Sequence, residues 1–408
     1  MIQVSIGRGR NSKLRHISRA RQTSKAGFAA VLLAGFAAVF LSGCVVDKVS
    51  DVTSSVGDVF ATGEPKAPAR VPMFVVSTRK GKAGDANELS DGIRESLQTV
   101  TVPPGHRPGD IERPSFGSEN PQKHFTVSAY RGLNDSDFQA ELASHLSGRI
   151  GSNRDVLLYV HGFNTSYDEA RFRLAQVVTD GRFGGVPILF TWPASGSLFD
   201  YEAAKESASA SRDALAQLLI QLSDVPDIGR IQIVAHSMGS WLTMEALRQD
   251  AIAGRPDLNG KLGEIMLAAP DIDLTVFKQQ IAKVDPAHIS LLVSANDRAL
   301  SVSRRLAGDR PRVGALNPRN PADKAIIDGL GVRVYDLSSQ ATDLTGHGAY
   351  TAPDVVRQIG ARIGEARVQD ADVTAVLGER PVDTKVVTQP LPPDPPVAAP
   401  PPVPEPAK

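Results

Sequence analysis

A serine stands where an apolar run meets a helical pattern, in the stretch IQIVAHSMGS at residues 231–240. The arrangement A-x-S-x-G around Ser237 is typical of a tight strand-to-helix turn that projects a nucleophilic hydroxyl for acyl transfer. Ala235 and Gly239 are small enough for the close backbone packing of that turn, although glycine is more usual at the first position. An ordinary helix N-cap is the alternative role for Ser237.

A serine hydroxyl needs a base, usually a histidine that a carboxylate orients. In the chain order serine, acid, histidine, the base follows Ser237, which leaves His288 and His347. His288 stands at the start of an apolar run, at the wrong end of a strand for chemistry. His347 lies in the loop LTGHGAY after the last apolar run, so we predict it as the base. A surface histidine without a catalytic role is the alternative.

The acid is predicted at Asp297, because the apolar run 289–295 ends directly before Asn296 and Asp297. The carboxyl ends of the strands form the edge where open α/β sheets bind ligands. Asp271 and Asp273, which follow the preceding apolar run, are rival candidates. A helix N-cap or a turn is the alternative role for Asp297.

Acyl transfer also needs donors for the developing oxyanion. The backbone N–H of Met238 is one candidate. The loop His161-Gly-Phe-Asn164 follows the apolar run 155–160 and offers the N–H of Phe163 as the second. We expect Gly162 to let the backbone turn and His161 to brace this supporting loop rather than react. A simple turn at a strand end is the alternative.

Alternating strands and helices must position these residues. Short apolar runs, several buried on both faces, predict an eight-stranded, mostly parallel sheet flanked by helices, an α/β class with an antiparallel start. Residues 81–123 are rich in Gly, Pro and polar residues and predict a long loop. The expected strands are 73–78, 124–130, 155–160, 187–191, 231–235, 264–269, 289–295 and 332–337, and the expected helices are about 166–180, 202–222, 239–252, 273–283 and 353–366.

Residues 71–366 resemble a bacterial family of α/β-hydrolases of unassigned function in the esterase/lipase superfamily. The resemblance implies the α/β-hydrolase fold and a Ser237, Asp297 and His347 triad, and it leaves the substrate open. It rests on FVVSTR (74–79), VHGFN (160–164), TWP (191–193), AHSMG (235–239), APDID (269–273) and SAND (294–297).

The N-terminus carries basic residues from Arg8 to Lys25, an apolar run at 26–41 and then Leu-Ser-Gly-Cys44. The run is short for a membrane span and fits a signal peptide. Its end resembles the lipobox of bacterial lipoproteins. This implies cleavage before Cys44, lipidation of that cysteine and attachment to a membrane in the cell envelope. Val45 favours the outer membrane, facing the periplasm. An uncleaved N-terminal anchor is the alternative.

The expected organisation is a signal peptide at 1–43, a flexible tether at 44–70, a hydrolase domain at 71–368 and a Pro-rich disordered tail at 369–408. The tail is predicted to be an extended spacer, with partner binding as the alternative. The arginine-rich segment 298–324 is either a surface insertion or a lid that faces anionic headgroups. Trp192 fits a pocket rim and the core equally well.

The 45 basic and 45 acidic residues cancel, but the N-terminal leader is basic, so the rest of the chain is acidic on balance and disfavours nucleic acid. One cysteine and scattered histidines predict no disulfide and no metal site. No phosphate-binding glycine loop precedes a Lys-Ser/Thr pair, so no cofactor is expected. The oligomeric state stays open.

Together these residues predict a serine hydrolase, similar to a carboxylesterase or lipase, that cleaves a small ester or a lipid in the cell envelope through an acyl-enzyme. The same residues could serve a thioesterase or an amidase. A protein of a different class, an envelope-anchored interaction protein on a hydrolase fold, is the alternative function.

Overall fold

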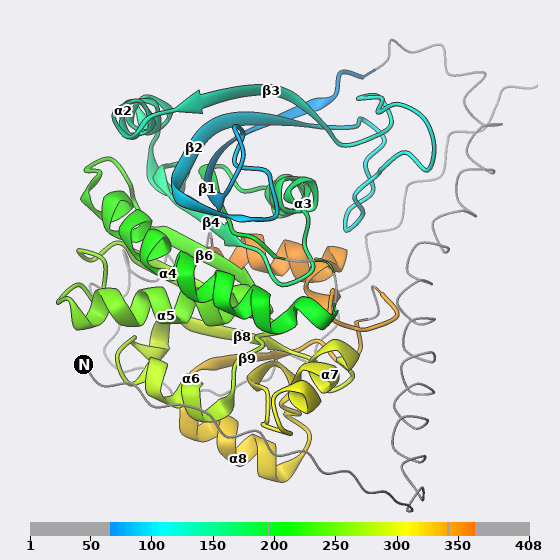
Figure 1. Cartoon of the computed structure of the whole chain (residues 1–408), viewed down its shortest axis with the longest axis vertical. Coiled ribbons are helices and arrows are strands. Elements are labelled where there is room, and N and C mark those ends of the chain that lie inside the picture. The colour runs from blue at the N-terminus through cyan, green and yellow to red at the C-terminus, as the bar shows by residue number, and fades with distance from the viewer. Residues whose placement is uncertain (1–65, 195, 197, 341–342, 364–408) are drawn as a thin grey trace, which may run out of the picture. The chain divides into compact units, whose positions relative to one another are not determined.

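The computed structural model describes residues 66–194, 196, 198–340 and 343–363 (Figure 1). Cys44, the apolar run before it, most of the expected tether and the Pro-rich tail lie outside these residues. None of the helices that the structure describes is long and apolar enough to cross a membrane.

A nine-stranded sheet forms the centre of the described region, in the order β3-β2-β1-β5-β4-β6-β7-β8-β9. From β1 to β9 along this order all neighbours are parallel, whereas β2 pairs antiparallel with both β1 and β3. The predicted mostly parallel α/β sheet is confirmed. The strands are β1 (Ala69–Arg79), β2 (Leu89–Val102), β3 (Thr126–Leu133), β4 (Val156–Val160), β5 (Val186–Thr191), β6 (Ile231–His236), β7 (Leu262–Ala268), β8 (Ile289–Val293) and β9 (Arg333–Asp336).

The predicted count of eight strands is wrong, because β2 forms within the expected loop. Three of its buried positions are polar, Ser96, Gln98 and Thr101, so the apolar alternation that predicts a strand is broken. The Gln98 amide donates to Ser96 Oγ at 2.9 Å and to the Tyr167 hydroxyl at 2.7 Å, which satisfies both buried side chains. As a result, the first two predicted strands, now β1 and β3, pair with β2 and not with each other.

Helices cover both faces of the sheet (Figure 1). One apolar cluster joins alternate strand residues such as Leu158 to α2, α4, α5 and α6. The intervening residues, such as Tyr159, belong to a second cluster with α3 and the helical residues 353–363. The named helices are α2 (Asp135–Leu146), α3 (Tyr167–Asp180), α4 (Tyr201–Asp224), α5 (Met238–Ile252), α6 (Leu274–Ile281), α7 (Arg298–Leu306) and α8 (Pro321–Leu330).

The arginine-rich segment 298–324 forms α7, a short 3₁₀ turn at Val313–Ala315 and the start of α8. Leu300 and Val313 are buried in it, and so is the side chain of Arg312. Part of this segment is therefore packed into the body of the domain. Both predicted alternatives, a lid and a surface insertion, would have left it on the surface. Trp192 is fully buried, so it belongs to the core rather than to a pocket rim.

Candidate active site

Ser237 sits on the tight turn between β6 and α5. Its backbone has φ 54° and ψ −123°, a conformation that is strained for a residue with a Cβ. Ser237 occupies the N-cap position of α5, yet its side chain makes no capping hydrogen bond. The hydroxyl is therefore not engaged by the end of the helix. The carbonyl of Ser237 instead anchors the turn, because it accepts from the N–H of Ser240 at 3.0 Å and of Asp271 at 3.2 Å.

The loop after β4 packs directly on this turn. A Cβ added to Gly162 would lie 2.8 Å from the Cβ of Ser237, and one added to Gly239 would lie 2.3 Å from the carbonyl oxygen of His161. Both distances are shorter than real Cβ contacts, so these positions require glycine. Met238 is the first residue of α5, where a backbone N–H has no acceptor within the helix. Phe163 follows Gly162, so the two candidate oxyanion donors belong to backbone segments that meet at Ser237.

His347 and Asp297 form a hydrogen-bonded pair. The imidazole Nδ1 lies 2.7 Å from Asp297 Oδ2, and the carboxylate is buried. The other oxygen of Asp297 accepts the N–H of Leu300 at 2.9 Å and so caps α7. Asp297 therefore caps α7, the alternative role that the sequence offered, and also contacts the histidine that is predicted as the base. Burial lowers the pKa of His347, but the hydrogen bond and charge of Asp297 outweigh it and raise that pKa above 6.5.

His236, which immediately precedes Ser237, connects the nucleophile turn to the loop that carries His347. The two imidazole rings have centroids 4.6 Å apart, and His236 Nε2 lies 3.3 Å from the carbonyl oxygen of His347. Burial and the nearby charge of His347 hold the pKa of His236 well below 6.5, so its Nε2 can act as an N–H donor of a neutral ring. Within the described residues no hydrogen bond joins Ser237 to His347, as is common in hydrolase sites without substrate.

The side chain of Asp343 folds the loop that presents His347. Its Oδ1 accepts the Thr345 N–H and hydroxyl, both at 2.8 Å, and the Gly346 N–H at 2.5 Å. Its Oδ2 accepts the Gly348 N–H at 2.7 Å. Burial disfavours the charged form of Asp343, yet these donors lower its pKa below the ordinary value. The carboxylate thus organises the backbone on both sides of His347.

The rival acids have other partners. Asp271 Oδ1 lies 3.1 Å from Arg312 Nε and accepts the Ser303 hydroxyl at 2.5 Å, while Oδ2 accepts the Tyr201 hydroxyl at 2.8 Å. Asp273 accepts the first N–H groups of α6 as its N-cap. Neither carboxylate forms a hydrogen bond with His347 among the described residues, so the geometry favours Asp297 as its partner.

His161 is fully buried beneath the supporting loop. Its Nε2 lies 2.9 Å from Thr191 Oγ1 and its Nδ1 lies 2.9 Å from the carbonyl oxygen of Gly162, while its ring stacks on Trp192. Burial, together with the charge of Arg79, lowers the pKa of His161 to about 3. A neutral, immobilised ring of this kind has the properties of a brace.

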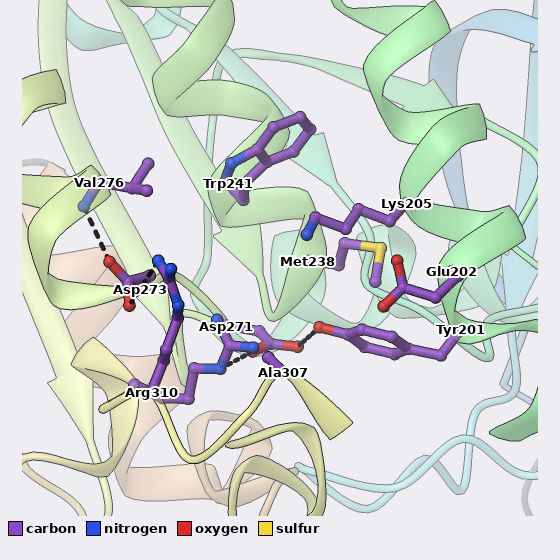
Figure 2. A pocket seen from close by; sticks show the side chains of 11 residues that line it. Tyr201, Glu202, Lys205, Met238, Trp241, Asp271, Asp273, Val276, Ala307 and Arg310 are labelled. Atoms are coloured by element: carbon purple, nitrogen blue, oxygen red, sulfur yellow. Dashed lines mark hydrogen bonds and ion pairs between the residues drawn. The ribbon is translucent and has the colours of Figure 1, made fainter. Parts of the chain in front are cut away.

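A cavity of about 210 Å³ lies beside the nucleophile turn, and Figure 2 shows the 11 side chains around it. Met238 and Asp271 line this cavity. Met238 follows Ser237 in the chain, and the backbone N–H of Asp271 donates to the carbonyl oxygen of Ser237. Phe163 packs edge-on against Tyr201, another lining residue, with ring centroids 5.6 Å apart. The cavity therefore adjoins the candidate oxyanion donors.

Metal ligands are not clustered in the part of the chain that the structure describes: no group of three His, Cys, Asp or Glu side chains has the geometry to hold an ion.

Several residues around the site were not anticipated from the sequence: His236, Asp343, Tyr201 and Arg312. His236 is the one with a usable sequence signal, since it lies next to the predicted nucleophile. The contacts of the others join segments far apart in the chain, or depend on how one loop folds.

A protein family described as an alpha/beta hydrolase of unknown function (DUF900) matches residues 134–363, which include every predicted catalytic residue. The uncharacterized protein alr1448 of Nostoc sp. (strain PCC 7120 / SAG 25.82 / UTEX 2576) is 39% identical over 61 residues, which make up 15% of this chain and 16% of that protein. The match thus spans well under two thirds of the relative.

Solved structures are similar at low identity. An esterase of Pyrobaculum calidifontis aligns with a TM-score of 0.36 and 11% identity, over 73% of this chain and 87% of the other. A predicted CIB-like hydrolase from Thermoplasma acidophilum aligns with a TM-score of 0.35 and 14% identity, over 73% of this chain and 99% of the other.

Proposed function

The chain belongs to the α/β-hydrolase family of unknown function DUF900, and from this premise we propose that it is a serine hydrolase that cleaves carboxylic esters. The family match confirms the resemblance that the sequence motifs indicate. The observation that carries the proposal is the 2.7 Å hydrogen bond between His347 and a buried Asp297. It supplies an oriented base on the same sheet edge as Ser237, whose side chain makes no capping hydrogen bond to α5.

In the proposed reaction, Ser237 Oγ attacks the ester carbonyl carbon while His347 Nε2 takes the hydroxyl proton. The N–H groups of Met238 and Phe163 stabilise the oxyanion of the tetrahedral intermediate. The bond to the alcohol oxygen then breaks, and His347 returns the proton to the leaving alcohol. Water attacks the acyl-enzyme in the same way, which releases the carboxylic acid and restores Ser237. Asp297 keeps the imidazole oriented and stabilises its cationic form throughout.

A fluorophosphonate probe and a series of nitrophenyl esters test this proposal on the full chain. We expect covalent labelling and ester turnover that disappear in Ser237→Ala and His347→Ala. Ser209→Ala, on α4, where the hydroxyl donates to the carbonyl oxygen of Lys205 one turn earlier, serves as the matched control and should keep both. A folded wild-type protein that neither labels nor hydrolyses any ester in the series would contradict the proposal and favour the interaction protein. Parallel thioester and anilide substrates decide between ester, thioester and amide cleavage.

We also propose that Cys44 carries a lipid that holds the enzyme on a membrane of the cell envelope, facing the periplasm. The support is the basic and apolar leader that ends in Leu-Ser-Gly-Cys. Incorporation of a labelled fatty acid in a bacterial host tests this directly. The wild type should incorporate the label and sediment with membranes, and Cys44→Ser should do neither. Labelling that persists in Cys44→Ser would disprove the assignment.

A further inference from the structure

The cavity beside Ser237 has an unusual lining for a site that would hold an acyl chain. Six of its side chains are charged, three anionic and three cationic: Glu202, Asp271, Asp273, Lys205, Arg310 and Arg312. We infer that this cavity binds a neutral, hydroxyl-rich group, such as a sugar ring, and that the substrate is an ester of such a polyol. This inference rests on the proposed function and specifies its substrate class.

An alkyl chain fits this cavity poorly. Covering charged groups with hydrocarbon removes them from water without replacing their hydrogen bonds, which costs free energy for each group. The other five lining residues, which are Tyr201, Met238, Trp241, Val276 and Ala307, supply the apolar part of its surface. The cavity is therefore suited to a ligand that replaces water as a hydrogen-bonding partner.

The inner wall of the cavity is the ion pair of Arg312 and Asp271, whose charges cancel. One guanidinium nitrogen of Arg312 remains open to a ligand. Arg312 is buried, its Nε lies 3.1 Å from Asp271 Oδ1, and its Nη2 donates to the carbonyl oxygen of Ser303 at 3.4 Å. Within the described residues Nε faces Asp271 as an ion pair without hydrogen-bond geometry and is fully buried, whereas Nη1 has no protein acceptor and is not fully buried. Nη1 is thus accessible on a side chain that lines the cavity. Asp271 is already satisfied by Arg312, Tyr201 and Ser303.

The outer wall offers an acceptor and a donor close together. Glu202 and Lys205 lie three residues apart on α4, and Figure 2 shows both side chains extending from that helix toward Met238. Neither side chain forms an ion pair or hydrogen bond within the part of the chain that is described. Both are exposed, so each can exchange water for a ligand.

Charge balance selects a neutral ligand. An anionic group in the cavity would face three carboxylates, and a cationic group would face three cations, so neither sign is favoured. A hydroxyl can donate one hydrogen bond and accept two, so adjacent hydroxyls match the open acceptor of Glu202 and the open donors of Lys205 and Arg312. The rings of Tyr201 and Trp241 add apolar surface for the C–H groups of a sugar.

Two esters of the same shape test the inference. 6-O-acetylglucose and cyclohexylmethyl acetate both carry a primary acetate on a six-membered ring, and only the first ring bears hydroxyls. We expect kcat/KM at least tenfold higher for the sugar ester. Glu202→Ala and Lys205→Ala should each lower this ratio several-fold, and Glu206→Ala, also on α4 but outside the cavity, should leave it unchanged.

The outcomes separate this inference from the proposed function. Equal turnover of the two ring esters by an enzyme that labels with fluorophosphonate would overturn the polyol assignment and leave the serine hydrolase intact. A preference for a ring that carries a carboxylate or an ammonium group would also overturn it. A protein that labels with no probe and hydrolyses no ester would refute both.

Discussion

Asp297 uses its two carboxylate oxygens for two different partners, so the orientation of His347 is coupled to the position of α7. Oδ2 lies 2.7 Å from His347 Nδ1, and Oδ1 accepts the N–H of Leu300, the third residue of the helix, at 2.9 Å. A carboxylate that is held by a helix end cannot rotate away from the imidazole. His347 is therefore positioned by secondary structure and not only by its own loop.

The pH dependence of activity should report this pair. A general base acts in its neutral form, and Asp297 raises the pKa of His347 above 6.5 against the effect of burial. The value of kcat/KM should therefore rise as pH increases through that raised pKa. In Asp297→Asn the charge is lost, so the midpoint should move to lower pH, and kcat should fall by about 10⁴-fold, the order known for the acid of a Ser-His-Asp triad.

Asp285→Asn is the matched control for that change. Asp285 caps the short 3₁₀ helix before β8, at the opposite end of that strand from Asp297. Its pH profile should overlay the wild type. An unchanged midpoint in Asp297→Asn would show that another group controls the profile.

The strain at Ser237 should be measurable as stability. Glycine tolerates a positive φ that alanine does not, so Ser237→Gly should have a free energy of unfolding about 1 kcal/mol above that of Ser237→Ala. Both variants lack the hydroxyl and both should be inactive. Urea denaturation of the two proteins gives the comparison, and equal stabilities would argue against a strained turn.

Close packing of the supporting loop predicts a sharp effect at Gly162. A methyl group there would meet the Cβ of Ser237 at 2.8 Å and His236 Nδ1 at 2.9 Å. Gly162→Ala should displace the oxyanion donor or the nucleophile and lower kcat by about 10²-fold, the order expected for a displacement near 1 Å. Gly132→Ala, where the nearest atom would be 3.8 Å away, should retain full activity.

Loss of the Asp343 carboxylate should loosen the base loop. Asn at this position keeps one acceptor oxygen and cannot satisfy the donors on both sides of His347. Because a hydrogen bond to a charged group contributes about 1.5 kcal/mol, Asp343→Asn should lower kcat/KM by roughly tenfold. Hydrogen exchange at the Gly346 and Gly348 amides should become faster, and it should not change in Asp354→Asn, whose carboxylate pairs with Arg357 on the surface.

A buried histidine far from the site predicts a second pH effect, on stability. His106 lies between Glu112 and Asp180, 2.9 Å from each. Burial opposes its charge, but both carboxylates raise its pKa to about 9. Its stabilising contribution is fully present below the unfolded pKa near 6.5 and is lost as pH rises through about 9. The melting temperature of the wild type should fall across this interval, and His106→Gln should remove this part of the fall.

The sequence was sufficient to predict the buried strands of the sheet. It was also sufficient to predict the order along the chain of the candidate nucleophile, acid and base. β4, β6, β7 and β8 are nearly continuous in apolar residues, so strands buried on both faces are easy to predict. Ser237 and Asp297 each follow such a strand, whereas His347 follows the half-buried strand β9. In contrast, β2 was missed because polar residues that bond to one another occupy its inward positions.

The wider site could not be derived from sequence spacing. Tyr201, Asp271 and the pair Ser303 and Arg312 come from three separate segments, and only the fold brings them together. The position of Asp343 near His347 in the chain could suggest a role. Its actual role depends on backbone N–H groups turning toward one carboxylate, which residue types alone do not reveal.

The place of β1 in the sheet also constrains how the chain can fold. β1 lies between β2, its neighbour in the chain, and β5, with Phe74 paired to Ile188. The meander of β1, β2 and β3 is local in the chain, whereas β5 follows much later, so the open edge of β1 has no partner until β5 has folded against it. An unpaired, apolar edge is prone to pair with other chains. We therefore expect the nascent chain, more than the finished enzyme, to depend on chaperones.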